Sequence, residues 1–408
     1  MKYIYLIIIK LYTASIFLVS PFNNKAKQWI KGRKNWKNKL KKNNAKENWI
    51  WFHVASLGEF EQARPLIEKI KQQKPYFKIL LTFFSPSGYE IRKNYSYADN
   101  VMYLPADSPK NASFFLDRIN PKIVFFVKYD LWYFYLNEIK KRKIKAYLIS
   151  AIFRENQLFF KKYGRWYANV LKAFDKIFVQ DENSKNLLQK IGIQNVIITG
   201  DTRFDRVIAI AENSSDIPVI KNFCQNNFCI VAGSTWEPDE KLIARFLSET
   251  KDNIKFIIAP HNIDNQHINK LEQLLSVSYI KYSNIKNEIP QNIRAVIIDN
   301  IGMLASLYKY AQIAYIGGGF GEGIHNILEA AVYGIVVIFG PKYHKFKEAI
   351  DLIQLQAAFS IKNFYEFKEK LYYFVKNRTQ LVKLGTIAKK YIYKNKNATE
   401  KIFKQIDF

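Results

Sequence analysis

Short apolar runs that end in turns or polar residues recur along this chain, and they constrain its fold more than any other feature. Strands of a parallel sheet are buried on both faces, so they read as continuous apolar runs, and the segments between them have room for crossover helices. The pattern therefore predicts a doubly wound α/β domain over residues 49–210. Its expected strands are WIWFHVAS, ILLTFFS, IVFFV, AYLISA, KIFVQ and VIITG.

The same rhythm restarts after a polar stretch at residues 211–225, which is the expected linker. A second doubly wound domain is predicted over residues 226–408, with amphipathic helices at its end, and a chain of 408 residues suits two such domains. Ligands of open α/β sheets bind at the carboxyl ends of the strands, so a cleft between the two domains is expected. The expected strands are FCIVAGS, KFIIAP, AVIID, IAYIGGG and IVVIFG.

The first 22 residues are expected to form a membrane anchor that either spans the bilayer or lies in its interface. Residues 3–22 are almost wholly apolar apart from Lys10, and about 20 such residues can just cross a hydrocarbon core. The following segment, residues 23–48, combines cations with aromatic rings, which is typical of a cytoplasmic headgroup zone. A cleaved signal peptide and a buried first helix of a soluble domain are the alternatives. The cations and rings are Lys25, Lys27, Trp29, Lys31, Arg33, Lys34, Trp36, Lys37, Lys39, Lys41 and Lys42.

The net charge of +28 would attract nucleic acid, anionic lipid or phosphorylated ligands. Much of it comes from lysine spread along the chain among many asparagines, as an A/T-rich genome would produce. No nucleic-acid recognition module is found, so no nucleic-acid partner is expected, whereas an anionic membrane surface is. Cys224 and Cys229 match neither a zinc knuckle nor a CxxC pair, and packing explains them.

The segment YIGGGFGEGIHNILEAAVYGIVVIFGP, residues 315–341, carries the clearest chemical signal. A strand runs into three glycines that include Gly318 and Gly319, and a helix is expected to begin near His325. Glycines let the backbone approach a phosphate, and a helix N-terminus supplies N–H donors, so a phosphate site is predicted. Glu329, one turn later, is placed to receive ribose or base hydroxyls. A glycine-rich turn needed only for packing is the alternative.

A second cluster, HVASLGEF, puts Glu59 at the start of the helix that follows the first strand. A carboxylate in a partly desolvated cleft can act as a general base, because burial raises its pKa toward the working pH. A first-turn acid that merely complements the helix dipole is the alternative. Polar side chains follow other expected strands, namely Ser85, Ser87, Lys128, Asp130, Asp201, Arg203, Asp205, Ser234, Thr235, His261 and Asn262. The chain has no Walker A, GxSxG, HExxH or DxD motif, so neither a metal nor another cofactor is expected.

At these motifs the sequence resembles the 3-deoxy-D-manno-octulosonic acid (Kdo) transferases of lipopolysaccharide synthesis, over nearly the whole chain. Besides the N-terminal segment with KGRKNW, the resemblance rests on HVASLGEFEQARPLI, LTFFSPSGYE, VKYDLW, ITGDTRFD, VAGSTWEPDE, IIAPHN, IIDNIGMLASLY and GGGFGEGIHNILEAA. It implies GT-B architecture. It also implies inverting transfer of Kdo from the donor CMP-Kdo to a lipid A precursor of the lipid IVA type, on the cytoplasmic face of a bacterial inner membrane.

The resemblance also implies roles for individual residues. Glu59 matches the general base, while Asp130 and Arg203 fall where the family places groups that stabilise the transition state. The segments that contact CMP correspond to Pro260 and His261, then Gly302, Met303 and Leu304, then Asn326, Ile327, Leu328 and Glu329.

The chain departs from the family pattern in three places. It has Lys128 and Asp130 where many members have two glutamates, His261 where arginine is common, and Met303 in place of a glutamate. Another GT-B enzyme or a nucleotide-sugar epimerase is the competing interpretation.

Overall fold

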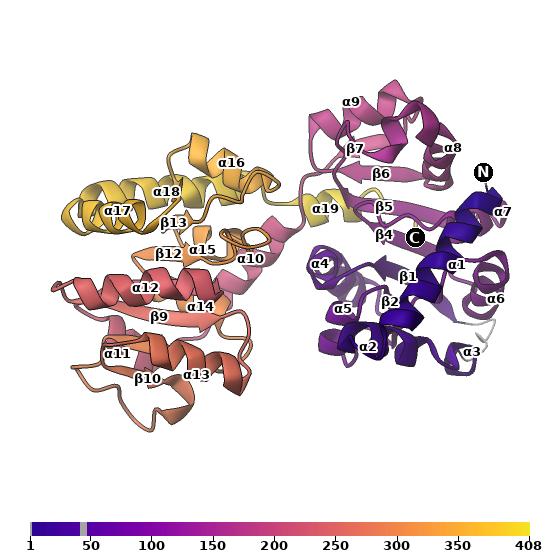
Figure 1. Cartoon of the computed structure of the whole chain (residues 1–408). Coiled ribbons are helices and arrows are strands. Elements are labelled where there is room, and N and C mark those ends of the chain that lie inside the picture. The colour runs from indigo at the N-terminus through magenta and orange to yellow at the C-terminus, as the bar shows by residue number, and fades with distance from the viewer. Residues whose placement is uncertain (1, 41–46) are drawn as a thin grey trace. The chain divides into compact units, whose positions relative to one another are not determined.

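The computed structural model describes residues 2–40 and 47–408, which form two compact units. Unit 1 contains residues 1–206 and 396–408, and unit 2 contains residues 207–395 (Figure 1). Each unit is built on one parallel sheet covered by helices, as the apolar runs predict.

The sheet of unit 1 has seven parallel strands in the order β3-β2-β1-β4-β5-β6-β7. The order reverses between β1 and β4, so the carboxyl ends of these two strands flank the switch point at which ligands of doubly wound folds bind. The strands are β1 (Asn48–Val54), β2 (Phe77–Phe83), β3 (Asn100–Tyr103), β4 (Ile123–Val127), β5 (Lys145–Ala151), β6 (Lys176–Val179) and β7 (Val196–Ile198).

Helices cover both faces of this sheet, and each face has its own apolar core. Polar caps fix where two of the helices begin: the side chain of Ser108 accepts the N–H of Asn111, and that of Asp181 accepts the N–H of Ser184. The helices are α4 (Leu57–Gln73), α5 (Pro86–Arg92), α6 (Pro109–Ile119), α7 (Tyr133–Lys141), α8 (Arg165–Ala168) and α9 (Glu182–Lys190). Helix α10 (Arg203–Glu212) begins in unit 1 and continues into unit 2.

The first helix, α1 (Lys2–Val19), lies along the outside of unit 1 (Figure 1). It is long and apolar enough to cross a membrane, and none of its residues is fully buried, so it is not the buried core helix considered as an alternative. Its residue Tyr5 attaches it to the body of unit 1. The ring of Tyr5 packs among Tyr133, Phe134, Trp166 and Tyr167, and its hydroxyl donates to Asp107 Oδ2 at 2.8 Å.

The expected juxtamembrane segment is in part a structural element of unit 1. Its helices α2 (Asn24–Arg33) and α3 (Trp36–Lys39) are followed by the buried Leu40. Trp29 and Arg33, predicted to face lipid headgroups, are buried instead. The guanidinium of Arg33 donates to the carbonyl oxygens of Phe84 and Leu104 at the ends of β2 and β3, and burial lowers its pKa to about 9.

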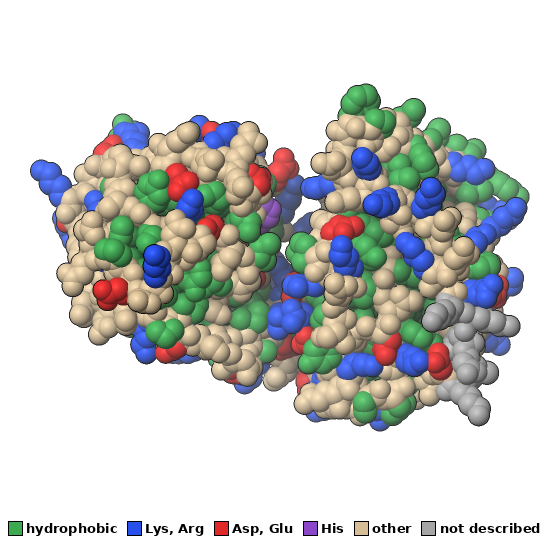
Figure 2. All heavy atoms as spheres, turned by 90° about the horizontal axis from the view of Figure 1, so that it is seen from below, with side chains coloured by type: hydrophobic (Ala, Val, Ile, Leu, Met, Phe, Trp, Pro, Cys, Tyr) green, Lys and Arg blue, Asp and Glu red, His purple; other side chains and the backbone are tan. Residues whose placement is uncertain are grey.

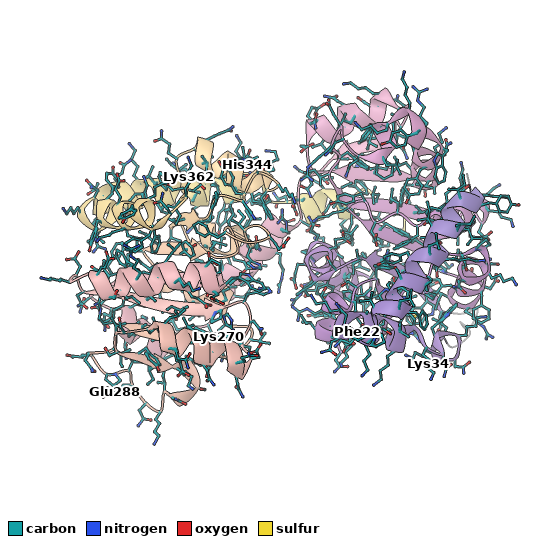
Figure 3. All side chains as sticks on the ribbon, viewed as in Figure 1. Phe22, Lys34, Lys270, Glu288, His344 and Lys362 are labelled. Carbon is teal, nitrogen blue, oxygen red and sulfur yellow. The ribbon has the colours of Figure 1, made fainter. Side chains whose placement is uncertain are left out.

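The lysines of this segment remain on the surface. Phe22, at the turn between α1 and α2, is 92% exposed, and Lys34 follows α2 (Figure 3). Lys41 and Lys42 lie outside the described residues. Elsewhere the basic side chains are scattered among acidic ones over the face of each unit that Figure 2 shows, as a genome-wide lysine bias would leave them.

Unit 2 repeats the architecture with the strand order β10-β11-β9-β8-β12-β13-β14, all parallel. Its switch point lies between β8 and β12. The strands are β8 (Phe228–Thr235), β9 (Ile254–Pro260), β10 (Tyr279–Lys281), β11 (Ala295–Ile297), β12 (Ile313–Ile316), β13 (Val336–Phe339) and β14 (Ala358–Ser360). The helices are α11 (Pro218–Cys224), α12 (Glu237–Glu249), α13 (Asn265–Leu274), α14 (Leu304–Leu307), α15 (Leu328–Ala331), α16 (Lys347–Gln354), α17 (Phe364–Lys376) and α18 (Arg378–Lys394).

Two of the expected domain boundaries differ from the structure. The expected linker, 211–225, contains α11, whose Ile220 and Phe223 are buried. The expected C-terminal domain ends early, because helix α19 (Ala398–Phe403) and the residues after it belong to unit 1. There Ile402 and Ile406 join the core under β1 and β2, and the carboxylate of Asp205 accepts the N–H groups of Asn397 and Thr399. Asp205, predicted as a strand-end ligand group, is therefore a helix cap.

Candidate active site

The carboxylate of Glu59 lies where β1 ends and α4 begins, and it is only 8% exposed. Its Oε2 accepts the backbone N–H of Ala55 at 2.5 Å. This bond resembles the return contact of a helix cap and orients the carboxylate. The structure thus places Glu59 in the first turn of the helix after β1, as the motif HVASLGEF predicts, and the strand order puts that strand end at the switch point of the sheet.

The surroundings of Glu59 favour its protonated form. Burial, followed by the like charge of Asp130, raises its pKa to about 7, against the lowering effects of the Ala55 N–H and of the charge on Lys128. A carboxyl that titrates near neutral pH can accept a proton efficiently in a reaction that runs there.

Asp130 follows β4, on the other side of the switch point. Its Oδ2 lies 2.9 Å from Nε2 of His53 and 3.1 Å from Nε1 of Trp132. The buried ring of His53 comes from β1, and its Nδ1 lies 2.9 Å from the hydroxyl of Thr82 on β2. Lys128, between β4 and Asp130, has a left-handed backbone (φ 58°).

Arg203, the third residue expected to act in catalysis, begins α10 and is held by Asp201. Both its Nε and its Nη2 lie 2.8 Å from Asp201 Oδ2. Asp201 is 4% exposed and also accepts from the side chain of Gln62 on α4, at 3.0 Å. Because Gln62 lies one turn after Glu59, the same helix positions both the carboxylate and the guanidinium.

The glycine loop of unit 2 follows β12, as predicted, but much of it is explained by packing. A Cβ on Gly317 would meet the backbone of Ser234 and Thr235, and one on Gly319 would meet the backbone of Gly340. The N–H of Gly318 donates to Asp239 Oδ2 at 2.9 Å, so it is not directed at an open site. The helix expected near His325 begins only at Leu328 and has four residues, which makes it a weak dipole for a phosphate.

A column of three rings stands at the carboxyl ends of the central strands of unit 2. Trp236 stacks on His261, with centroids 4.6 Å apart, and His261 stacks on His325 at 4.5 Å. Burial, followed by the neighbouring His261, lowers the pKa of His325 to about 4, so this imidazole is neutral at pH 7. Trp236 is 43% exposed and offers a flat apolar face.

The remaining residues expected to contact CMP divide into exposed loops and core. Gly302 has a left-handed backbone (φ 102°), and the side-chain amide of Asn300 lies 2.9 Å from the sulfur of Met303. Leu304 begins α14, and Pro260 ends β9. Asn326 donates to Glu329 Oε1 at 3.0 Å. Ile327 and Leu328 are fully buried, so their side chains pack in the core and only their backbone is available to a ligand.

Sequence reasoning missed the buried polar residues behind the strand ends. His53, Gln62 and Asp239 each support a predicted residue, but they read as ordinary members of a strand or helix. A signal existed only for His53, which lies in the apolar run WIWFHVAS, because a polar group buried in a strand needs a partner. Gln62 and Asp239 lie on helices α4 and α12, where the sequence gives no such signal. Among the described residues, 2–40 and 47–408, no group of three or more His, Cys, Asp or Glu side chains could hold a metal ion.

The sequence profile of the 3-deoxy-D-manno-octulosonic-acid transferase (kdotransferase) family matches residues 33–206. The Kdo transferase of Aquifex aeolicus is 27% identical over 331 residues, which cover 79% of this chain and 84% of the relative. The Kdo transferase of Rickettsia felis is 28% identical over 342 residues, which cover 81% of this chain and 72% of the relative. These matches support its identification as a Kdo transferase, a glycosyltransferase of lipopolysaccharide biosynthesis.

Solved structures of similar fold agree with the two-unit architecture of this chain. A UDP-GlcNAc 2-epimerase from Neisseria meningitidis superposes with a TM-score of 0.61 at 16% identity, over 87% of this chain and 98% of that one. MurG of Acinetobacter baumannii gives a TM-score of 0.55 at 12% identity, over 88% and 98%. The fold class predicted from the apolar runs and the resemblance, two doubly wound domains of the GT-B type, is confirmed.

Proposed function

We propose that this enzyme moves Kdo from CMP-Kdo to a sugar hydroxyl of a lipid A precursor of the lipid IVA type, with inversion at the anomeric carbon. The observation that carries the proposal is the buried carboxylate of Glu59, which titrates near pH 7 beside Asp130 in the part of the chain that matches the family profile.

In the proposed step, Glu59 takes the proton from the acceptor hydroxyl as that oxygen attacks the anomeric carbon of Kdo. The bond from this carbon to the phosphate oxygen breaks, and CMP leaves from the opposite face with the bonding electrons. Arg203, fixed by Asp201, offers a guanidinium to the charge on the departing phosphate. The donor is assigned to unit 2, where the ring column lies in the segments that follow β8, β9 and β12, and Glu329 lies on α15 after the glycine loop.

The lipid acceptor is assigned to unit 1, which has an apolar cavity of about 310 Å³ between α1, α2 and the loop after β2. Ser85 in the wall of this cavity donates its N–H to Ala55 O at 2.8 Å, so the cavity adjoins the residue that holds Glu59. Its apolar lining suits an acyl chain. The lining includes Tyr12, Ile16, Val19, Trp29, Phe84 and Pro86.

The membrane role of α1 is part of the same proposal. Its outward side chains Ile7 and Leu11 are 55% and 64% exposed, and lysines of α2 and α3 follow them in sequence. Such a helix binds a bilayer through apolar burial together with attraction to anionic lipid. We assign the enzyme to the cytoplasmic face of the inner membrane.

The test is incubation with CMP-Kdo and a tetra-acylated lipid A precursor, followed by mass analysis of the lipid. Addition of one or more Kdo units, unaffected by EDTA, is the expected result. UDP-GlcNAc serves as the comparison donor, because the epimerase-like fold leaves a UDP-sugar as the competing substrate. Turnover of UDP-GlcNAc without transfer from CMP-Kdo would overturn the proposal.

A further inference from the structure

The buried imidazole of His53 has no role in the chemistry described above, yet it contacts the acid that flanks Glu59. It lies at the centre of five polar side chains that run across β1, β2 and the end of β4. Trp51 Nε1 donates to the hydroxyl of Thr82 at 2.8 Å, and Thr82 lies 2.9 Å from His53 Nδ1. His53 Nε2 then lies 2.9 Å from Asp130 Oδ2.

The two neighbours of His53 Nε2 place opposite demands on it. The indole of Trp132 can only donate, and its Nε1–H, 2.9 Å away, fits a lone pair on Nε2, whereas Asp130 Oδ2, also 2.9 Å away, fits a proton there. The indole has a second acceptor in Asp130 Oδ2 at 3.1 Å, whereas a lone pair on Nε2 would face an ionised carboxylate oxygen, which is repulsive. We therefore assign the proton to Nε2, with the imidazole and the indole both donating to Asp130 Oδ2.

We infer that His53 is a positioning residue: through its Nε2–H it holds the carboxylate of Asp130 beside Glu59. The inference rests on the proposed function and goes beyond it, since it assigns a role to a side chain buried behind the site. Asp130 is itself partly exposed, with 24% of its side chain accessible, so without this anchor the carboxylate has room to turn away. Thr82 and the ring of Phe126, whose centroid is 5.2 Å away, hold the imidazole in turn.

Substituting His53 by glutamine or by asparagine distinguishes the roles of its two ring nitrogens. The amide nitrogen of glutamine reaches the position of Nε2, whereas that of asparagine reaches only the position of Nδ1. We expect His53→Gln to keep kcat within about 5-fold, and His53→Asn to lower it by about 10- to 100-fold, the usual cost of misplacing an active-site group by about 1 Å. The KM for CMP-Kdo should change by no more than about twofold in either variant, because the donor is assigned to unit 2.

Tyr135→Phe is the matched control for general damage to this core. Its hydroxyl is buried in the same apolar cluster and donates to Pro105 O at 3.2 Å, without contact to His53 or Asp130. It should lower the melting temperature and leave kcat unchanged.

The deciding measurement is the effect of His53→Asn in an Asp130→Asn background. If His53 acts through Asp130, the double variant should turn over as slowly as Asp130→Asn alone, within about twofold. Both single variants should also move the acid limb of kcat/KM to lower pH, because the like charge that faces Glu59 is displaced or lost while Lys128 remains.

A His53→Asn enzyme with full kcat, or one that loses the same factor with and without Asp130, would overturn the inference. If His53→Asn does not fold, Thr82→Val replaces it in the cycle, since it removes only the hydroxyl that holds Nδ1. Thr82→Val should lower kcat a few-fold on its own and should not lower it further in the Asp130→Asn background. If the wild-type protein has no transfer activity, both the proposed function and this role of His53 are overturned. If the wild type is active but the losses of kcat in His53→Asn and Asp130→Asn add in the double variant, only the role of His53 is overturned.

Discussion

The hydroxyl of Tyr5 on α1 and the buried carboxylate of Asp107 are joined by a hydrogen bond of 2.8 Å, although 102 residues separate them in sequence. Asp107 also accepts the N–H groups of Phe134 and Tyr135 and so caps α7. One carboxylate therefore links the first helix to the body of unit 1, and burial raises its pKa to about 6.

Tyr5→Phe should loosen this attachment. The change removes one hydrogen bond to a charged group and leaves the aromatic packing, so it should lower the free energy of unfolding by about 1–2 kcal/mol. Urea unfolding is the measurement. Tyr3→Phe is the control, because Tyr3 is on the same helix and is 70% exposed, and it should have no effect. Equal stability of the Tyr5 variant and the wild type would mean that α1 is not held at this point.

Glu59→Gln should lower kcat by roughly 10²- to 10⁴-fold, because it removes a positioned base. The glutamine oxygen can still accept the Ala55 N–H, so CMP-Kdo affinity should hardly change. In the wild type a base with a pKa of about 7 must be ionised, and kcat/KM should fall as the pH drops below 7. Single-turnover rates across pH 5–9 test both points, and a variant with wild-type turnover would remove Glu59 from the chemistry.

Glu59→Gln should also raise the stability of the protein above pH 7, whereas it should lower the stability if Glu59 only capped the helix. A carboxyl whose pKa is raised by folding stabilises the protein fully below its unfolded pKa, and that stability is lost as the pH rises through about 7. At pH 8 the ionised group should cost on the order of 2–3 kcal/mol. Glu59→Gln should therefore melt higher than the wild type at pH 8, and the difference should shrink toward pH 5. A lower melting temperature at pH 8 would support the simple helix cap instead.

Gly319→Ala and Gly321→Ala test what the glycine loop is for. A Cβ on Gly319 would lie 2.6 Å from the backbone of Gly340, whereas one on Gly321 meets nothing closer than 3.6 Å. The first variant should therefore be destabilised by about 1–3 kcal/mol, the typical cost of overpacking, and the second should be neutral. Thermal melts without ligand measure this, and two equally stable variants would show that packing does not require glycine here.

Glu329→Ala should weaken CMP-Kdo binding about 10-fold, the cost of one hydrogen bond to a charged group, and leave lipid binding unchanged. Glu322→Ala is the control, because it removes an exposed carboxylate from the same loop. Calorimetric titration with CMP-Kdo and with precursor-containing micelles reports the two affinities separately. If both affinities fall together, Glu329 does not belong to the donor site alone.

The apolar runs predicted the central strands of both sheets because these strands are buried on both faces and need continuous apolar sequence. They did not predict β3, β10 and β14, which are edge strands of three or four residues. The motifs placed Glu59 and Asp130 each after an expected strand, but only the strand order, in which β1 pairs with β4, shows that the two strand ends are neighbours. Sequence spacing could not reveal that Gly318 is bonded to Asp239, or that Arg33 is buried, because both contacts depend on packing between distant segments.

The return of residues 396–408 to unit 1 has a consequence for the order of events during synthesis. Ile402 and Ile406 fill the core under β1 and β2, which are translated some 350 positions earlier. Domains emerging from the ribosome generally fold one after another, starting with the N-terminal one. Here unit 1 cannot complete its apolar core until residues 396–408 have been translated, which is after the whole of unit 2. Unit 2 can therefore finish folding first.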